Sequence, residues 1–354
     1  MKNINLNFLL ILLFISSCTN YEYNDKKITH INEKSFKTTD TVQTKSWNIT
    51  SRLYQPLLIE SIKNNLFVND IKNDSGLLHV LNKKDQSYKK CIGNRGRGKN
   101  ELIGIWRIKK NQNQLFTYDL TLGKMIRYNT NVLNETISTK EYFLKKEQLP
   151  NMYDFDFIND SIIVCSAMHS KKRLTFINLN ENKVIKRKGH FPIKFNKKYH
   201  ENVLSTLFRP EIRTNKERII LAGFRTNIIE IYDFNGARIK SITFLDKKIP
   251  EFNTVQKGGT SHYKSINGVY RAFLDVVLTK KYFYVLYSGK KSSSQNYWSK
   301  KLYQFDLNGN PIKKYVFDRN VAKIIFSDMN NKFYGISVDS KTGKSDIVSF
   351  NLKP

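Results

Sequence analysis

The 354-residue chain has little of what usually reveals a cross-linked fold or a catalytic centre. Its three cysteines, Cys18, Cys91 and Cys165, form no Cys-x-x-Cys pair, so neither a disulfide framework nor a cysteine zinc site is expected. Cys165 lies in the apolar stretch SIIVCSA and is expected to be buried. No Gly-x-Ser-x-Gly motif occurs, which excludes the nucleophile elbow of the α/β-hydrolases. Helical periodicity is nowhere sustained over three turns, and this favours an all-β protein.

Acidic residues are also scarce, because 30 Asp and Glu face 60 Lys and Arg, for a formal charge of +30. A basic chain of this kind could bind nucleic acid. Here the lysines are spread along the whole chain among abundant Asn, Ile, Phe and Tyr. We therefore interpret the excess as solvated surface and expect no nucleic-acid partner and no cofactor.

The N-terminus carries an export signal. The apolar run from Phe8 to Ile15 is about half the length of a membrane-spanning helix, so residues 1–17 are predicted to be a signal peptide. Ile15-Ser16-Ser17-Cys18 resembles a bacterial lipobox, in which the cysteine becomes the acylated N-terminus. We expect Cys18 to anchor the protein in the cell envelope, with the outer membrane favoured and its face left open. The alternative is an ordinary secretory signal in which Cys18 is incidental.

The segment that follows the signal peptide is polar. Residues 18–40 contain few apolar side chains, and such a segment buries too little surface to offset its ordering entropy. It is predicted to be a flexible tether for a folded domain over residues 41–354.

Six repeats organise that domain. Strand patterns that end in Asn or Asp recur at intervals of 45 to 73 residues, the size of a four-stranded propeller blade with insertions. These repeats end at Asn82, Asn129, Asn178, Asp233, Asp306 and Asn351. Four strands in each of six units predict a six-bladed β-propeller, whereas a β-sandwich would not explain the regular repetition.

Ring closure is predicted from the two ends of the domain. The chain stops at Pro354, after the third strand pattern of the sixth repeat, while residues 41–49 form a strand pattern without a neighbour. The N-terminal strand is therefore expected to join the last blade, which removes two exposed edges.

A glycine-rich stretch, CIGNRGRGKNEL, resembles the skeleton of a phosphate-binding P-loop. A P-loop needs Ser or Thr after its Lys and a helix that begins there. Asn100 follows Lys99, and the next residues, LIGIWRIKK, have a strand pattern. The nucleotide hypothesis is rejected, and Gly93, Gly96 and Gly98 are expected to supply backbone freedom for a tight crossing between blades.

The same crossing carries a family resemblance. Gly96, Gly98, Glu101 and Leu102 match the inter-blade Gly-x-Gly-x-Gly-x-Glu-Leu signature, with Lys99-Asn100 in place of the more usual Pro-Gly. With the lipobox, the chain resembles the TolB-like, NHL-like six-bladed propeller lipoproteins of Gram-negative bacteria. The resemblance implies an exported, lipid-anchored propeller and transfers no catalytic residue.

One face of the predicted propeller is a candidate ligand site. The long loops 191–203, 245–270 and 289–300 all lie between an outer and the next inner strand, or between second and third strands, and these connections share one face. Basic and aromatic side chains in these loops and in the crossings 93–102 and 144–151 suit a peptide or glycan. A solvated loop surface with packed aromatics is the alternative. The candidates are Arg95, Arg97, Lys99, Phe195, Tyr263, Tyr297 and Trp298.

The axis is the second candidate region. Charged residues of the inner strands could bind an ion or polar ligand there, or simply pair around a water-filled channel. They are Glu60, Arg107, Asp154, Asp156, Arg209 and Asp275. Four histidines in loops, His169, His190, His200 and His262, show no ligand spacing.

Two functions follow from these patterns. The first is a lipid-anchored binding or scaffold module for a protein, peptide or glycan, without assigned catalytic residues. The alternative is a metal-dependent hydrolase or lyase that uses axial carboxylates, with the metal unknown.

Overall fold

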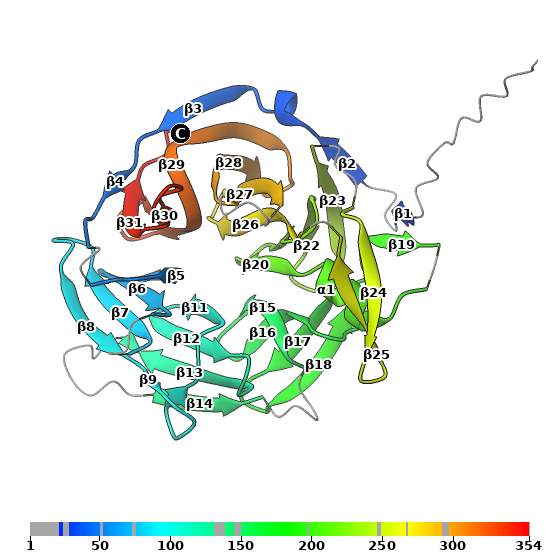
Figure 1. Ribbon diagram of the computed structural model, residues 1–354, viewed down its shortest axis with the longest axis horizontal. Coiled ribbons are helices and arrows are strands. Elements are labelled where there is room, and N and C mark those ends of the chain that lie inside the picture. The colour runs from blue at the N-terminus through cyan, green and yellow to red at the C-terminus, as the bar shows by residue number, and fades with distance from the viewer. Residues whose placement is uncertain are drawn as a thin grey trace, which may run out of the picture.

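The chain forms a ring of β-sheets around a central axis (Figure 1). The computed structural model describes residues 21–23, 28–49, 52–72, 76–130, 139–144, 150–196, 198–245, 249–266, 268–291 and 297–353. The inner strands of the sheets surround the axis in Figure 1, which confirms the predicted all-β propeller. The signal peptide and Cys18 lie outside the described residues, and no described helix is long and apolar enough to cross a membrane.

Blades one to three are four-stranded antiparallel sheets. Their strands, from the axis outward, are β5 (Pro56–Ile62), β6 (Asn65–Asp70), β7 (Leu78–Asn82) and β8 (Tyr88–Ile92); β11 (Arg107–Asn111), β12 (Gln114–Asp119), β13 (Lys124–Asn129) and β14 (Thr139–Phe143); and β15 (Met152–Phe157), β16 (Ile162–Ala167), β17 (Leu174–Asn178) and β18 (Lys183–Lys188).

The cores lie between neighbouring blades, because successive side chains of a strand point to opposite faces. On β12, Leu115 packs in the cluster shared with blade one. The next residue, Phe116, packs in the cluster shared with blade three, where its ring centroid lies 4.5 Å from that of Phe157. Every blade is thus apolar on both faces, as the strand patterns indicate.

Blades four to six continue the ring. Their strands are β20 (Pro210–Thr214), β21 (Ile219–Gly223), β22 (Ile228–Tyr232) and β23 (Arg238–Phe244); β26 (Tyr270–Leu278), β27 (Tyr282–Lys291), β28 (Ser299–Asp306) and the first part of β29 (Pro311–Ser327); and the second part of β29, β30 (Lys332–Val338) and β31 (Ser345–Phe350). The long strand β29 runs from the outer edge of blade five to the axial position of blade six (Figure 1).

An N-terminal segment, residues 28–49, runs along the outside of the last three blades. Its elements are β2 (Ile28–Ile31), the 3-10 helix η1 (Glu33–Ser35), β3 (Thr38–Val42) and β4 (Lys45–Ser46). β2 pairs in parallel with β23, β3 in parallel with β29, and β4 antiparallel with β31. An additional short strand, β1 (Tyr21–Tyr23), pairs with β19 (Ile193–Phe195).

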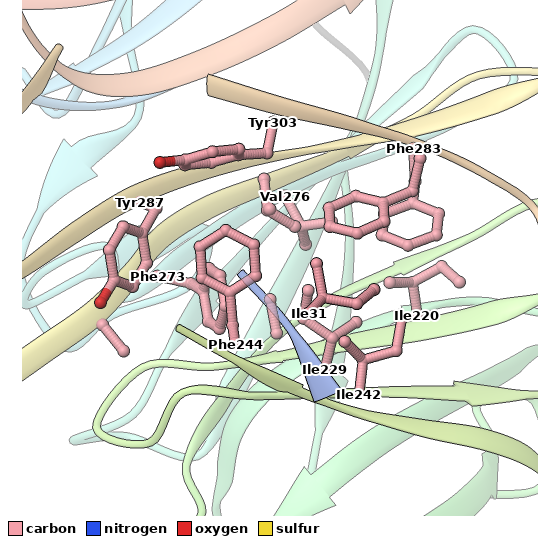
Figure 2. Close-up of a cluster of buried hydrophobic side chains, with 14 of the residues drawn as sticks. Ile31, Ile220, Ile229, Ile242, Phe244, Phe273, Val276, Phe283, Tyr287 and Tyr303 are labelled. Atoms are coloured by element: carbon pink, nitrogen blue, oxygen red, sulfur yellow. The ribbon is translucent and has the colours of Figure 1, made fainter. Parts of the chain in front are cut away.

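Residues 28–40 therefore differ from the flexible tether expected there. Ile31 packs among the apolar side chains between blades four and five (Figure 2). Glu33 accepts hydrogen bonds from Lys301 and Lys314, both at 2.7 Å, and these bonds lower its pKa to about 2. Ile31 and Glu33 thus fix this polar segment to the ring, and the average composition of the segment does not reveal such single anchors.

The connection into blade four also differs from expectation. The stretch LSTLFRPEI (204–212) has the apolar pattern of an inner strand, but it is divided between α1 (Glu201–Leu207) and β20. His200 begins the helix, since its side chain accepts from the Asn202 N–H at 3.2 Å, and Val203 and Leu207, four residues apart, are buried. The loop 245–270 contains a hairpin of β24 (Phe252–Lys257) and β25 (Thr260–Ser265).

The glycine-rich crossing contains a short parallel pair, β9 (Asn94–Arg95) and β10 (Glu101–Leu102), and is followed by a strand. Only Gly93 of the three glycines has a positive φ, +80°. A Cβ on Gly96 would lie 2.0 Å from Glu101 Oε2, and the Gly98 N–H donates to that oxygen at 2.8 Å. Two of the glycines thus make room for a carboxylate instead of supplying backbone freedom.

Candidate functional site

Inner strands place every second side chain at the axis. On β15, Asp154 and Asp156 share the axial side, while Phe155 and Phe157 belong to the core toward blade two. The same alternation brings Arg107 of β11 and Glu211 of β20 to the axis.

Asp154 is the centre of the first axial contact network. It is fully buried and pairs with Arg107 Nε at 2.9 Å and Lys109 Nζ at 3.1 Å. It also accepts from the Ile212 N–H at 2.6 Å, a bond that joins blade three to blade four. Both oxygens of this carboxylate are therefore engaged in holding neighbouring blades.

Glu211 extends the network across the axis. Its carboxylate lies 3.4 Å from Arg107 and 3.2 Å from Lys323, and Lys323 lies 3.7 Å from Asp275. Burial opposes ionisation of Glu211, but the charges of Arg107 and Lys323 outweigh it and lower the pKa to about 2. Asp275 accepts from the Ile324 N–H of blade six at 3.1 Å. This middle layer contains three basic and three acidic side chains and is neutral.

A cavity of about 980 Å³ opens at one end of the axis, where the turns between first and second strands meet. We name it the short-turn cavity. Glu60, Lys110, Asp156 and Arg213 line it together with turn residues such as Asp160. Both signs of charge are thus present at this end.

Two carboxyls of the short-turn cavity are strongly buried. Burial raises the pKa of Glu60, and the charges of Lys110 and Arg213 oppose this shift. Burial likewise raises the pKa of Asp156, and the charges of Lys109 and Arg213 oppose it. Asp156 accepts from the Thr214 N–H at 2.7 Å.

The described part of the chain offers no metal centre. No group of three or more His, Cys, Asp or Glu side chains within it could hold a metal ion. Asp156 and Asp275, two of the axial carboxylates that the metal-dependent alternative would use, accept hydrogen bonds from backbone N–H groups of the next blade.

The opposite end of the axis carries a cluster of arginines on aromatic rings. Arg209, directly before β20, lies with its guanidinium carbon 4.8 Å from the ring centroid of Trp106 and 4.6 Å from that of Phe224. Arg271 of β26 lies over the same Phe224 ring at 4.7 Å and over Tyr297 at 4.6 Å. Cation–π contacts of this kind orient a guanidinium without neutralising it.

Arg225 completes this set, and we name Arg209, Arg225 and Arg271 the arginine cluster. It follows Phe224 in the loop between β21 and β22 and lies 4.8 Å from the centroid of Tyr263 on β25. All three residues lie on the long-loop face, which we define by the outer-to-inner crossings and the second-to-third-strand loops.

Among the described residues, no carboxylate forms an ion pair with the arginine cluster, although the charge of Glu211 acts on Arg209 and Arg271. The Nε atoms of its three members are buried, and no described residue accepts a hydrogen bond from them. Burial and the charge of Arg107 lower the pKa of Arg209 to about 9. Burial also lowers the pKa of Arg271, and the charge of Arg225 adds to that effect.

The basic residues of the glycine-rich crossing lie away from the arginine cluster. β9 is at the outer edge of the ring, near β13 and β14 (Figure 1). Arg95, Arg97 and Lys99 are exposed there, and Arg95 donates to the Ile103 carbonyl at 2.9 Å. Lys124 holds this crossing by donating to the carbonyl of Gly98 at 2.9 Å.

The four aromatic candidates divide between packing and the arginine cluster. Phe195 packs in a small core beside the ring, 5.8 Å from Phe252, whereas Tyr263 stacks on Phe252 and also supports Arg225. Tyr297 supports Arg271, and the Trp298 ring centroid lies 3.9 Å from that of Tyr297.

Three histidines are closer together than their sequence spacing indicates. Burial and the charges of His200 and His262 lower the pKa of His169. Asn202 Nδ2 lies 3.0 Å from His262 Nδ1. His200 lies at the start of α1 and His262 on β25, both on the long-loop face.

Several functional candidates were not predicted. Lys109 and Glu211 lie two positions after Arg107 and Arg209, so strand alternation could have identified them. Arg225 and Arg271 lie beside the axis only because a loop and a strand entry converge there, and no local pattern marks them.

The family model for TolB-like 6-blade propeller-like proteins matches residues 29–329. The chain belongs to this family. The family defines six blades, in agreement with the sheets described above.

Two solved structures show the same fold. A Bacteroides fragilis protein assigned as exported has a TM-score of 0.59 at 12% identity, with 92% of this chain and 100% of that chain covered. A DUF4221 family member from Bacteroides vulgatus has a TM-score of 0.52 at 13% identity, with 89% and 97% covered. No curated protein sequence matches the chain.

Proposed function

We propose that this family member is a lipid-anchored binding or scaffold module of the cell envelope that recognises a protein, peptide or glycan through its long-loop face. The observation that carries the proposal is the arginine cluster, whose buried donors have no described acceptor on that face. The elements inserted between blades support it, because β19, α1 and the β24–β25 hairpin all belong to crossings on the same face. Surface insertions that surround one mouth of a rigid ring are a common way to build a binding site.

The membrane attachment rests on the N-terminal sequence. A short apolar run that ends at Ser16-Ser17-Cys18 supports export and acylation of Cys18. The fold relative from Bacteroides fragilis, itself assigned as exported, agrees with an envelope location. We place the protein at the outer membrane and leave its periplasmic or surface face open.

Partner capture with a trimmed loop tests the binding function. In the variant, residues 255–262 are replaced by Asn-Gly, which joins the paired residues Thr254 and Tyr263 through a two-residue hairpin turn. Mature protein and variant are cross-linked in intact cells, and the captured components are identified by mass spectrometry. We expect at least one envelope component to be lost from the variant.

The matched control changes the opposite face. Asn308→Ala alters an exposed residue of the turn between β28 and β29 and should retain every component. Identical capture by the trimmed variant, the control and the unaltered protein would contradict recognition through the long-loop face.

Anchoring has a separate test. Cys18→Ser should abolish labelling by a fatty-acid probe and leave an uncleaved precursor, because serine lacks the thiol that is acylated before a lipoprotein signal peptide is cleaved. Loss of the acyl chains also removes about 0.8 kcal/mol of membrane affinity per buried CH₂. Labelling that persists in Cys18→Ser would show that the lipid is attached elsewhere or that Cys18 is incidental.

A further inference from the structure

We infer that the arginine cluster is a binding site for a dianionic oxyanion, of the phosphate-monoester type, carried by the ligand of the long-loop face. The inference rests on the proposed binding function and specifies its chemistry. It assigns Arg209, Arg225 and Arg271 as the residues that contact the anion.

The first argument is the state of the donors. Buried polar atoms are nearly always hydrogen-bonded, and leaving them without an acceptor is costly. Three Nε atoms in one cluster lack an acceptor among the described residues. Elsewhere at the axis, Arg107 Nε pairs with Asp154 and Nη2 with Glu211, and Nη1 donates to the Trp106 carbonyl. An oxyanion at the mouth of the axis would supply the missing acceptors.

Charge balance is the second argument. The middle layer below the cluster is neutral, with Arg107, Lys109 and Lys323 against Asp154, Glu211 and Asp275. Among the described residues, the three cluster arginines are therefore a surplus of positive charge, because Glu211, which acts on Arg209 and Arg271, is already balanced within the middle layer. A carboxylate would neutralise one of these charges, whereas a phosphate monoester carries close to two negative charges near neutral pH.

The third argument concerns how the guanidinium groups are held. Arg209 and Arg271 share the ring of Phe224, and each contacts a further ring, Trp106 for Arg209 and Tyr297 for Arg271. The rings are thus occupied by cations, which favours an anion site over a platform for stacking a neutral sugar. Guanidinium forks fixed in this way match the oxygens of a phosphate group and lose little entropy on binding.

The opposite end of the axis provides an internal contrast. Arg213 lines the short-turn cavity, but the carboxylates of Asp275, Glu60 and Asp156 act on it and raise its pKa. An anion there would meet these carboxylates. Charge selection therefore favours the long-loop mouth.

The test uses the mature protein and inorganic phosphate at about pH 8, where phosphate is mainly dianionic. Isothermal titration calorimetry compares phosphate with acetate at equal ionic strength. Phosphate should bind with at least about tenfold higher affinity than acetate, because additional charge-assisted hydrogen bonds form.

Arg271→Gln and Arg225→Gln should each weaken phosphate binding by about tenfold or more. Arg187→Gln is the matched control, since Arg187 is exposed on the outer strand β18 of blade three; it should bind phosphate as the unaltered protein does. Circular dichroism verifies that each variant is folded, and a variant that fails to fold is replaced by the corresponding Lys substitution, which keeps the charge but loses the fork.

Equal affinity for phosphate and acetate, or unchanged phosphate affinity in both cluster variants, would overturn the inference. The outcome is separable from that of the binding proposal. Loss of a partner on loop trimming without phosphate binding would retain the long-loop face and reject its oxyanion chemistry. Phosphate binding without a captured partner would retain the oxyanion site and reject the recognition of a partner through the long-loop face.

Discussion

The two ends of the propeller axis differ in how their charges are compensated. The short-turn cavity combines the carboxyls of Glu60 and Asp156 with basic side chains, and the Thr214 N–H of the next blade donates a hydrogen bond to Asp156. The long-loop mouth holds three arginines against aromatic rings, and no described residue accepts a hydrogen bond from their Nε atoms. The charges at one end of the ring are thus compensated within the described protein, whereas those at the other end are not. Uncompensated charge that folding alone does not require points to the long-loop mouth as the functional end.

The largest expected effect is at the compensated middle of the axis. Asp154→Ala should reduce the free energy of unfolding by about 3–5 kcal/mol, because it leaves the buried cations of Arg107 and Lys109 without their main partner. Urea denaturation measures the loss. Asp328→Ala, which removes an exposed partner 3.5 Å from Lys110, should cost about 1 kcal/mol or less. Comparable losses in the two variants would show that the buried network is not what joins the blades.

The axial network also shows how far sequence alone leads. Repeat spacing predicted the six blades, and the sequence identified Asp154 and Asp156 as charged residues of an inner strand. It did not predict the bonds from these carboxylates to the backbone of blade four, because those partners depend on the rotation of one blade against the next.

The arginine cluster was harder to anticipate. Arg209 was a candidate as a charged residue of an inner strand, and it lies directly before β20. Arg225 belongs to a loop between strands, and Arg271 lies at the start of β26. Only closure of the ring brings these segments to one mouth. The prediction of a flexible tether was wrong for residues 28–40 for a related reason. Ile31 and Glu33 are isolated anchors whose partners lie in blades four and five.

An intermediate effect is expected at the short-turn cavity, as a dependence of stability on pH. Burial raises the pKa of Glu60 in the folded protein above its unfolded value. A raised carboxyl pKa contributes stability at low pH that is lost as the pH rises through the folded pKa. Glu60→Gln should therefore have nearly the stability of the unaltered protein at about pH 4 and exceed it increasingly toward about pH 8.

Differential scanning calorimetry across this range measures the difference in Tm. Glu217→Gln, at an exposed position of the same cavity, is the control and should show a constant difference. A difference in Tm between Glu60→Gln and the unaltered protein that decreases with rising pH would contradict the burial argument.

The smallest effect is predicted for the long-loop mouth. Arg209→Met should change the free energy of unfolding by about 1 kcal/mol or less, because lost cation–π contacts are offset by relief of repulsion from Arg107. Arg107→Met should cost about 3–5 kcal/mol, since it leaves the carboxylates of Asp154 and Glu211 without this partner. Chemical denaturation of both variants makes the comparison, and a cost for Arg209→Met equal to that for Arg107→Met would assign the cluster a structural role.

The central claim is that unpaired positive charge at the long-loop mouth selects an anion. Anomalous diffraction from crystals of the mature protein grown with selenate, a tetrahedral dianion, measures this directly. We predict a selenium peak within hydrogen-bond distance of Arg209, Arg225 and Arg271, absent from crystals of Arg271→Gln, and no peak in the short-turn cavity. A peak in the short-turn cavity with none at the arginine cluster would contradict the account.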